Sequence, residues 1–177
     1  MTEEEFNIIP LEEIEAQELH NLIAKNKEFW GRYFPVTIAK TETLSKTLLF
    51  IAELALQKSK EELFLFGLRA FDTGLLIGII YLKNIDWELK EAELAYAIDK
   101  GYKNRGWTSS AVTSVSDKAF NMGLKTLIII AHKSNKGSVS VAKKSGYLWS
   151  RTLKNEFTPT GEEPLDMELF IRKKHLV

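Results

Sequence analysis

The chain of 177 residues contains no cysteine, and this absence removes several kinds of chemistry. Without thiols there is no disulfide framework, no thiolate metal site and no cysteine nucleophile. The chain also has no net charge, because 24 Lys and Arg residues balance 24 Asp and Glu residues. A balanced chain has no overall field to attract nucleic acid or an anionic membrane. We therefore expect no nucleic acid and no membrane among its partners.

Long apolar runs are missing as well, and none approaches the ~20 residues of a membrane-spanning helix. The first residues, MTEEEFNII, are acidic where a secretory signal would be basic and then apolar. Proline is scarce, with four residues, and we find no repeat or low-complexity linker that would mark a domain boundary. With 45% hydrophobic and 27% charged residues, the composition is that of a globular domain with its own core. We predict one cytoplasmic domain, residues 1–177, acting as an enzyme or a binding module.

Hydrophobic periodicity predicts a mixed α/β fold with the order β-α-α-β-β-β-α-β-α-β-β. We expect a mixed central sheet of six to seven strands with helices on both faces. Residues 28–35, EFWGRYFP, are expected to form a mobile loop, and the helix at 43–58 carries an apolar stripe of Leu48, Ile51, Ala52 and Ala55. The helices are predicted at 11–25, 43–58, 108–122 and 136–145, and the strands at 6–9, 63–70, 75–85, 91–99, 126–132, 147–157 and 165–173.

A glycine-containing loop joins the alternating strand at 91–99 to the helix at 108–122. Its sequence, with the start of the helix, is GYKNRGWTSS, residues 101–110. The apolar run TLIIIAH, residues 126–132, then reads as a strand buried on both faces. A strand, a crossover helix and a second strand form a parallel pair. The loop is therefore placed before a helix N-terminus, where free N–H groups and the helix dipole favour an anion.

Four interpretations compete for this loop. A triphosphate loop needs lysine where Trp107 stands, and a dinucleotide loop needs three glycines where only Gly101 and Gly106 occur. A plain turn into a helix requires no ligand at all. The fourth interpretation is a pyrophosphate held by backbone amides, as in the binding of coenzyme A.

Two segments carry a resemblance to a known family. KNRGWT, residues 103–108, resembles the Q/R-x-x-G-x-G/A loop of the GNAT superfamily of acetyl-CoA-dependent N-acetyltransferases. SNKGSVSVAKKSGYL, residues 134–148, is similar to the family's N-x-x-S-x-x-x-x-x-K-x-G-[FY] segment. AELAYAID resembles the family's splayed central strand. The resemblance covers nearly the whole chain and is closest to the Rim-like branch, the acetyltransferases of ribosomal-protein N-termini.

The resemblance implies a single GNAT domain with acetyl-CoA as its cofactor. The cofactor would lie along the backbone of the central strand and on the loop, and would reach the second motif. Thr108 stands where the family has Gly or Ala, and its hydroxyl is expected to cap the helix or to donate to a phosphate oxygen. The residues assigned to the cofactor are Ala97, Ile98, Lys103, Asn104, Arg105, Gly106, Trp107, Thr108, Ser109, Asn135 and Lys144.

Three residues are candidates for the transfer of acetyl to an amine. Glu93 would orient the amine or take its proton, with a solvated strand face as the alternative. Ser138 would protonate the leaving thiolate, with a helix-capping role as the alternative. Tyr147 is the other proton donor, or else a core residue. Asn135 has a helix-capping alternative too.

The remaining features are less specific. His132 at the end of the 126–132 strand is read as structural, and no residue pattern suggests a metal. An acidic set favours a cationic acceptor, or else is a solvated turn: Asp86, Glu88, Glu91 and Glu93. An aromatic set forms a wall over the acceptor site, or else packs on the sheet: Trp30, Tyr33, Phe34 and Pro35. The acceptor is a protein N-terminus or a small-molecule amine, and exposed strands near the C-terminus are compatible with a homodimer. The competing functions are a CoA-binding relative without activity, acting as a sensor or partner-binding module, and a domain without cofactor.

Overall fold

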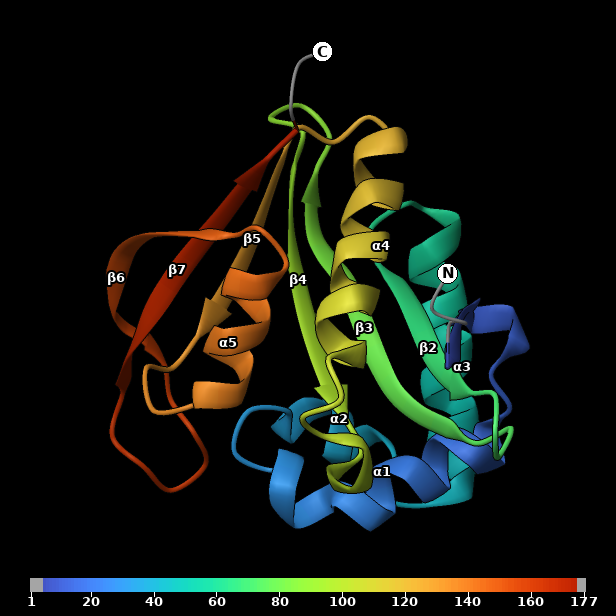
Figure 1. Cartoon of the computed structure of the whole chain (residues 1–177). Helices are drawn as coiled ribbons and strands as arrows, with labels where there is room; N and C mark the ends of the chain where they lie inside the picture. Colours follow the sequence, from blue (N-terminus) through green and yellow to red (C-terminus); the bar gives the residue numbers. More distant parts are fainter. Residues whose placement is uncertain (1–4, 175–177) are drawn as a thin grey trace. The chain divides into compact units, whose positions relative to one another are not determined.

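The computed structural model describes residues 5–174, and its elements follow the chain in the order shown in Figure 1. Short 3₁₀ turns lie at Leu11–Glu13 and Lys100–Tyr102. The helices are α1 (Ala16–Trp30), α2 (Pro35–Lys40), α3 (Leu44–Ser59), α4 (Trp107–Asn121) and α5 (Lys136–Lys144). The strands are β1 (Phe6–Pro10), β2 (Phe64–Ala70), β3 (Leu76–Asp86), β4 (Glu91–Ile98), β5 (Thr126–Ala131), β6 (Leu148–Phe157) and β7 (Leu165–Lys173).

The strands form a seven-stranded mixed sheet with the order β1-β2-β3-β4-β5-β7-β6. β4 and β5 are parallel, as the strand-helix-strand pattern predicted. β1 pairs antiparallel with β2, and β7 pairs antiparallel with both β5 and β6. The mixed α/β class and the strand count predicted from the sequence are confirmed.

The described chain divides into two compact units, and each is treated by itself below. Unit 1 runs to Tyr81 and includes Tyr96–Trp107, whereas unit 2 contains Leu82–Ala95 and the chain from Thr108 onward. The chain passes from one unit to the other within β3 and within β4. The candidate phosphate-binding loop, residues 101–106, belongs to unit 1. The chain enters unit 2 at Thr108, within α4.

In unit 1, the first helix has the predicted length of 15 residues but begins and ends five residues later than predicted. α1 begins after a capping box in which Glu15 and Glu18 each accept from the other's backbone N–H. It buries Leu19, Leu22 and Ile23, which recur at helical spacing, and continues to Trp30. The prediction of a loop at 28–35 is therefore wrong at both of its ends.

The two loop signals at 28–35 have helical roles in the structure. Gly31 keeps right-handed helical geometry with φ −54°, and Pro35 occupies the first turn of α2, where its missing N–H has no cost.

The stripe predicted for the helix at 43–58 is not the face that α3 buries. α3 buries Thr47, Phe50 and Leu54, while Leu48 is 56% exposed.

In unit 2, α4 buries an apolar face that includes Ala111, Val112 and Val115. Gly123, with φ +112°, follows the helix and adopts the backbone conformation that ends it. β5 differs from its prediction, because its two faces are unequal. Leu127, Ile129 and Ala131 are buried, whereas the alternate residues are half-buried.

Candidate functional site

The parallel pairing of β4 and β5 is short. Within unit 2, the register joins Glu91, Ala92 and Glu93 to residues 126–128. β4 continues to Ile98, and β5 remains paired with β7 as far as Ala131. Glu93 thus lies where the pairing of the two strands ends, which is the splayed geometry expected of this strand.

Glu93, the candidate base, makes two contacts with β3 in unit 2. Its Oε1 lies 3.2 Å from Lys83 Nζ, and its Oε2 accepts a hydrogen bond from Asn84 Nδ2 at 2.8 Å. The side chain is 13% exposed. A carboxylate has about four acceptor positions, so two remain for an amine or a bridging water. The two β3 residues therefore fix the orientation of the carboxylate without saturating it.

Four consecutive amides at the base of the loop already have protein acceptors in unit 1. Asp99 N–H donates to the Ile77 carbonyl at 2.7 Å, and Tyr102 N–H donates to the Asp99 carbonyl at 2.9 Å. Lys100 N–H donates to Asn26 Oδ1 at 3.0 Å, and Gly101 N–H donates to Asp99 Oδ1 at 2.8 Å. The turn at residues 99–102 is thus fixed before the loop begins.

Asp99 is the buried acid of this turn, and Lys25 Nζ lies 2.6 Å from its Oδ2. Burial opposes ionisation of the carboxyl. The hydrogen bonds from Lys25 and from the Gly101 N–H outweigh it and hold the pKa of Asp99 below its usual value. The carboxylate is therefore charged at neutral pH and keeps both contacts.

The loop bends at two residues with positive φ. Asn104 has φ +63° and Gly106 has φ +83°. A Cβ built on Gly106 would meet nothing within 4 Å, so the position needs glycine for its backbone conformation and leaves open space beside it. α4 begins at the next residue, Trp107, and runs for 15 residues. The open space therefore lies at the N-terminal end of a long helix, where first-turn N–H groups have no helical acceptor.

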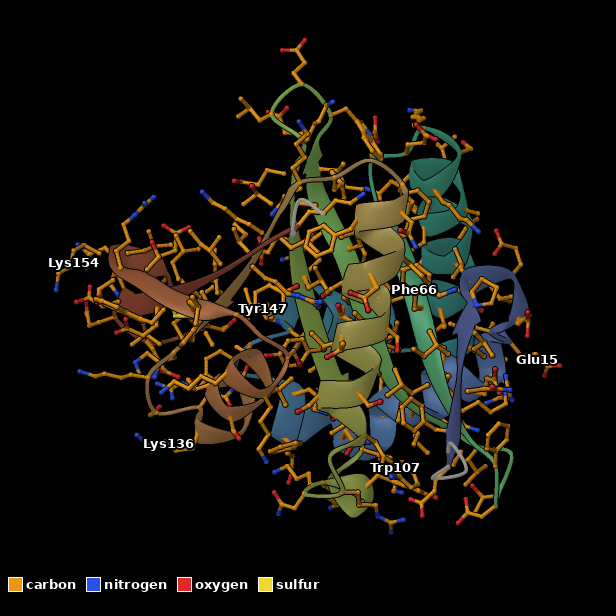
Figure 2. All side chains as sticks on the ribbon, turned by 45° about the horizontal axis from the view of Figure 1, so that its top comes forward. Glu15, Phe66, Trp107, Lys136, Tyr147 and Lys154 are labelled. Atoms are coloured by element: carbon orange, nitrogen blue, oxygen red, sulfur yellow. The ribbon has the colours of Figure 1, made fainter. Side chains whose placement is uncertain are left out.

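The loop's cations and its tryptophan are held by neighbours in unit 1. Lys103 Nζ lies 3.5 Å from the centre of the Phe29 ring, and the Arg105 guanidinium stacks over Tyr102 and Trp107. Trp107 is buried at the start of α4 (Figure 2), and its Nε1 donates to Glu5 Oε2 at 2.8 Å. Trp107 therefore anchors the loop, while the exposed Lys103 and Arg105 supply positive charge.

Thr108 and Ser109 belong to the first turn of α4. Because the helix begins at Trp107, Thr108 lies inside it, and the prediction of Thr108 as a helix cap is wrong. In unit 2, the Ser109 carbonyl accepts hydrogen bonds from Thr113 Oγ1 at 2.9 Å and from Ser145 Oγ at 3.0 Å. The first turn of α4 is thereby tied to the end of α5.

In unit 2, the second motif forms α5 and its cap. Asn135 is the N-cap, and its Oδ1 accepts from the Ser138 N–H at 3.2 Å, which confirms the capping alternative for Asn135. Ser138 takes part in this cap through its backbone N–H, and its side chain is half-buried. Lys144 is exposed in the last turn of the helix.

Tyr147, the other candidate donor, is 1% exposed. Its hydroxyl lies 2.7 Å from Ser116 Oγ, which donates to the Val112 carbonyl of α4. Burial raises the pKa of Tyr147 to about 12. These contacts favour the core alternative for Tyr147, whose position Figure 2 labels.

The cofactor candidates on β4 lie in unit 1 beside an aromatic cluster. Ile98 accepts a hydrogen bond from Trp30 Nε1 at 3.2 Å, which leaves its carbonyl a second acceptor position. The Ala97 carbonyl lies 2.9 Å from where a Cβ on Gly78 would be, so Gly78 permits a close approach of the strands. Trp30 is buried, and Phe34 stacks on Tyr81 at 6.4 Å, which favours packing for this part of the predicted wall.

The other residues considered from the sequence add no site. His132 Nδ1 lies 2.6 Å from Ser134 Oγ, a local contact. Among residues 5–174, no group of three or more His, Asp or Glu side chains is arranged to hold a metal ion. Over the same residues, each helix is too short or too polar to cross a membrane.

Sequence reasoning missed the residues that support these candidates. Lys83 and Asn84 orient Glu93, and Asn26 and Asp99 hold the base of the loop. Asp99 had a signal, because an Asp two residues before a glycine favours an Asx turn. Asn26 had none, since its partner is 74 positions away in the sequence.

Comparison with known proteins agrees with this architecture. Residues 6–148 match the Acetyltransferase (GNAT) domain family. The chain is 28% identical over 140 residues to the probable N-acetyltransferase YjcK of Bacillus subtilis (strain 168), covering 78% of this chain and 77% of that relative.

Two solved structures are similar in fold. The ribosomal-protein-S5-alanine acetyltransferase from Vibrio fischeri has a TM-score of 0.86 at 17% identity, covering 98% of this chain and 95% of that chain. The microcin C7 self immunity acetyltransferase MccE, solved with acetyl-CoA and AMP, has a TM-score of 0.84 at 20% identity, covering 97% and 94%. Because the family match spans most of the sequence, this chain belongs to the GNAT acetyltransferase family.

Proposed function

We propose that this protein is an acetyl-CoA-dependent N-acetyltransferase that transfers acetyl directly to a primary amine. The observation that carries the proposal is the bend at Gly106, with its positive φ and open surroundings, at the start of α4. Such a bend presents backbone N–H groups at the positive end of a helix dipole, which suits a pyrophosphate.

The residues of the loop fit the cofactor's anionic end. The amides of residues 103–109 would face the pyrophosphate, since those of residues 99–102 are already used within unit 1. Lys103 and Arg105 would add positive charge. The β4 backbone at Ala97 and Ile98 would pair with the pantetheine arm, and Asn135 and Lys144 are proposed as further contacts. The family membership and the fold shared with an acetyl-CoA complex support this assignment.

Acetyl-CoA supplies the thioester, and the residues of the chain move protons around it. The amine nitrogen forms the new C–N bond, the C–S bond breaks, and one proton leaves the amine as the thiolate gains one. Glu93, oriented by Lys83 and Asn84, takes the amine proton directly or through water. Ser138 donates to the thiolate, and we favour it over Tyr147 because Tyr147 is only 1% exposed whereas Ser138 is half-buried.

The acceptor we propose is a protein N-terminus or a small-molecule amine. An α-amine has a reference pKa of about 7.7–8.0, whereas a lysine side chain has one of about 10.4. A single carboxylate that orients the amine is therefore sufficient for an α-amine at neutral pH. The ribosomal-protein acetyltransferase among the structural neighbours favours the first of these classes.

Calorimetric titration with acetyl-CoA tests the cofactor, using the native protein and a Gly106→Tyr variant. A matched control is Gly161→Tyr, because Gly161 also has positive φ (+76°) and nothing within 4 Å of a built Cβ. Both variants carry the same backbone strain, but only Gly106→Tyr fills the proposed phosphate site. We expect binding by the native protein and by the Gly161 variant, and its loss in the Gly106 variant.

A screen of amine acceptors with acetyl-CoA then tests the activity. N-terminal peptides, polyamines and amino acids are offered, and the release of thiol is measured. Binding without thiol release from any acceptor would indicate the non-catalytic alternative. No binding by the native protein would refute the cofactor assignment.

A further inference from the structure

One face of α1 contacts the base of the loop at four points, all within unit 1. Its residues, here called the α1 face, are Lys25, Asn26, Phe29 and Trp30, which are spaced so that they share one side of the helix. They contact Asp99, the Lys100 amide, the Lys103 side chain and the Ile98 carbonyl, respectively. Each contact falls in the six residues that lead from β4 into the loop.

Asn26 is the unusual member of the α1 face. The other buried residues of α1 are apolar, namely Leu19, Leu22, Ile23 and Trp30, yet Asn26 is 1% exposed among them. A buried amide is costly unless its hydrogen bonds are made. Its Nδ2 donates to the Leu22 carbonyl at 2.9 Å, and its Oδ1 accepts from the Lys100 N–H at 3.0 Å.

Asn26 Oδ1 accepts from the Lys100 N–H, so that each of the four amides at residues 99–102 has a protein acceptor. The acceptors of Asp99, Gly101 and Tyr102 lie in β3 or within the turn itself, so Asn26 supplies the acceptor that comes from a helix. Removal of the side chain would leave the Lys100 amide without this partner. The turn would then have alternative conformations, and the following amides would lose their fixed direction.

We propose that Asn26 is a positioning residue that presets the cofactor loop from α1, so that the loop is already formed before a ligand arrives. This inference rests on the proposed function, because that function supplies the ligand, CoA. The contact between Asn26 and the loop does not depend on it. A preset loop binds an anion without first losing conformational freedom, and such preorganisation increases affinity. Asn26 itself touches no ligand in this scheme.

The first experiment follows amide hydrogen exchange in the native protein by NMR, with and without CoA. Without CoA, the amides of Lys100 and Gly101 should exchange slowly and those of residues 103–106 quickly. Addition of CoA should slow residues 103–106 alone. Fast exchange at Lys100 and Gly101 before CoA is added would overturn the proposal, and this result needs no variant.

The second experiment compares Asn26→Ala with Asn21→Ala, the same change at an exposed position of α1. Each variant is titrated with CoA and with pantetheine, which lacks the phosphates. We expect Asn26→Ala to bind CoA roughly tenfold or more weakly, since the partly buried Lys100 N–H loses its acceptor. The affinity of Asn26→Ala for pantetheine should remain within about twofold of native. The affinity of Asn21→Ala for both ligands should do so as well, since a twofold change is below the effect of one net hydrogen bond.

The outcomes separate this inference from the function on which it rests. Equal loss of CoA and pantetheine binding would indicate general damage to the fold and would overturn a positioning role, as would unchanged CoA binding. If the native protein binds no CoA, the proposed function fails, and the exchange rates at Lys100 and Gly101 still decide whether Asn26 presets the turn. If Asn26→Ala does not fold, the native exchange data decide alone.

Discussion

The hydroxyl groups of Ser116 and Tyr147 lie 2.7 Å apart in the interior of unit 2. Ser116 also donates to the Val112 carbonyl, so the pair joins α4 to the residue that precedes β6. A buried hydroxyl with its partner in place contributes to stability and is poorly placed to meet a substrate. The pair leads to a prediction that separates folding from catalysis.

Tyr147→Phe should lower stability and leave turnover nearly intact. The variant removes one hydrogen bond, and the Ser116 hydroxyl keeps its bond to Val112, so we expect a loss of about 1 kcal/mol in the free energy of unfolding. Urea denaturation measures that loss, and steady-state kinetics with a saturating acceptor measures kcat. A fall in kcat of ~100-fold or more, the scale of a lost general acid, would instead make Tyr147 the proton donor.

Stability should fall in alkaline solution because of two buried tyrosines. Burial raises the pKa of Tyr81 and of Tyr147 to about 12 each, from an ordinary value of 10.0. A raised pKa means that the folded state holds the phenolic proton more tightly, so its contribution is complete below pH 10 and is lost as pH rises toward 12.

The measurement is the free energy of unfolding at several pH values above 9, for the native protein and for Tyr81→Phe. Tyr81→Phe should show a shallower decline, because one of the two groups is gone. Identical slopes for native and Tyr81→Phe would contradict the assignment.

Glu93→Gln should lower kcat by about 100-fold or more near neutral pH, the typical size of general-base catalysis. Glutamine keeps an oxygen for the Asn84 amide, so the fold and the affinity for acetyl-CoA should be retained. Glu91→Gln, two residues earlier on the same face of β4, is the matched control and should be close to native. Equal effects at both positions would point to the charge of the strand rather than to a base.

Ser138→Ala should lower kcat with the α5 cap intact, whereas Asn135→Ala should remove that cap. Asn135 caps α5 with its side chain, so Asn135→Ala should cost about 1 kcal/mol of stability. Ser138 contributes its backbone N–H to that cap, which alanine preserves, so Ser138→Ala should keep the cap and lower kcat. Thermal denaturation and kcat, measured on both variants, test this contrast. A stable Ser138→Ala with native kcat would remove Ser138 from the proposed chemistry.

The parts of the fold that the sequence predicted are those with clear periodicity and clear stops. β4 alternates, α4 has one apolar face, and Gly123 ends that helix, so their bounds came within about two residues. α3 shows where periodicity fails. Its leucines and alanines extend around most of the helix, so spacing could not tell the buried face of Phe50 and Leu54 from the exposed face of Leu48.

The candidate site was predicted as a set of residues and not as a set of contacts. The loop residues Lys103, Asn104, Arg105 and Gly106 could be named from the sequence, because short motifs record local backbone needs. The partners of Glu93 on β3 and the contacts from α1 to the loop depend on pairings distant in the sequence. Aromatic residues and glycine at 28–35 suggested a loop, while the hydrogen bond from Trp30 to Ile98 helps to fix the end of α1.

The order of strands in the sheet also has a consequence for folding during synthesis on the ribosome. β7 lies between β5 and β6 and pairs with both, although it is made after them. During synthesis, β6 therefore emerges with no strand to bind, and β5 lacks one neighbour until β7 follows. The central strands can pair while the chain is still growing, whereas the β5-β7-β6 side closes only when Leu165–Lys173 has emerged.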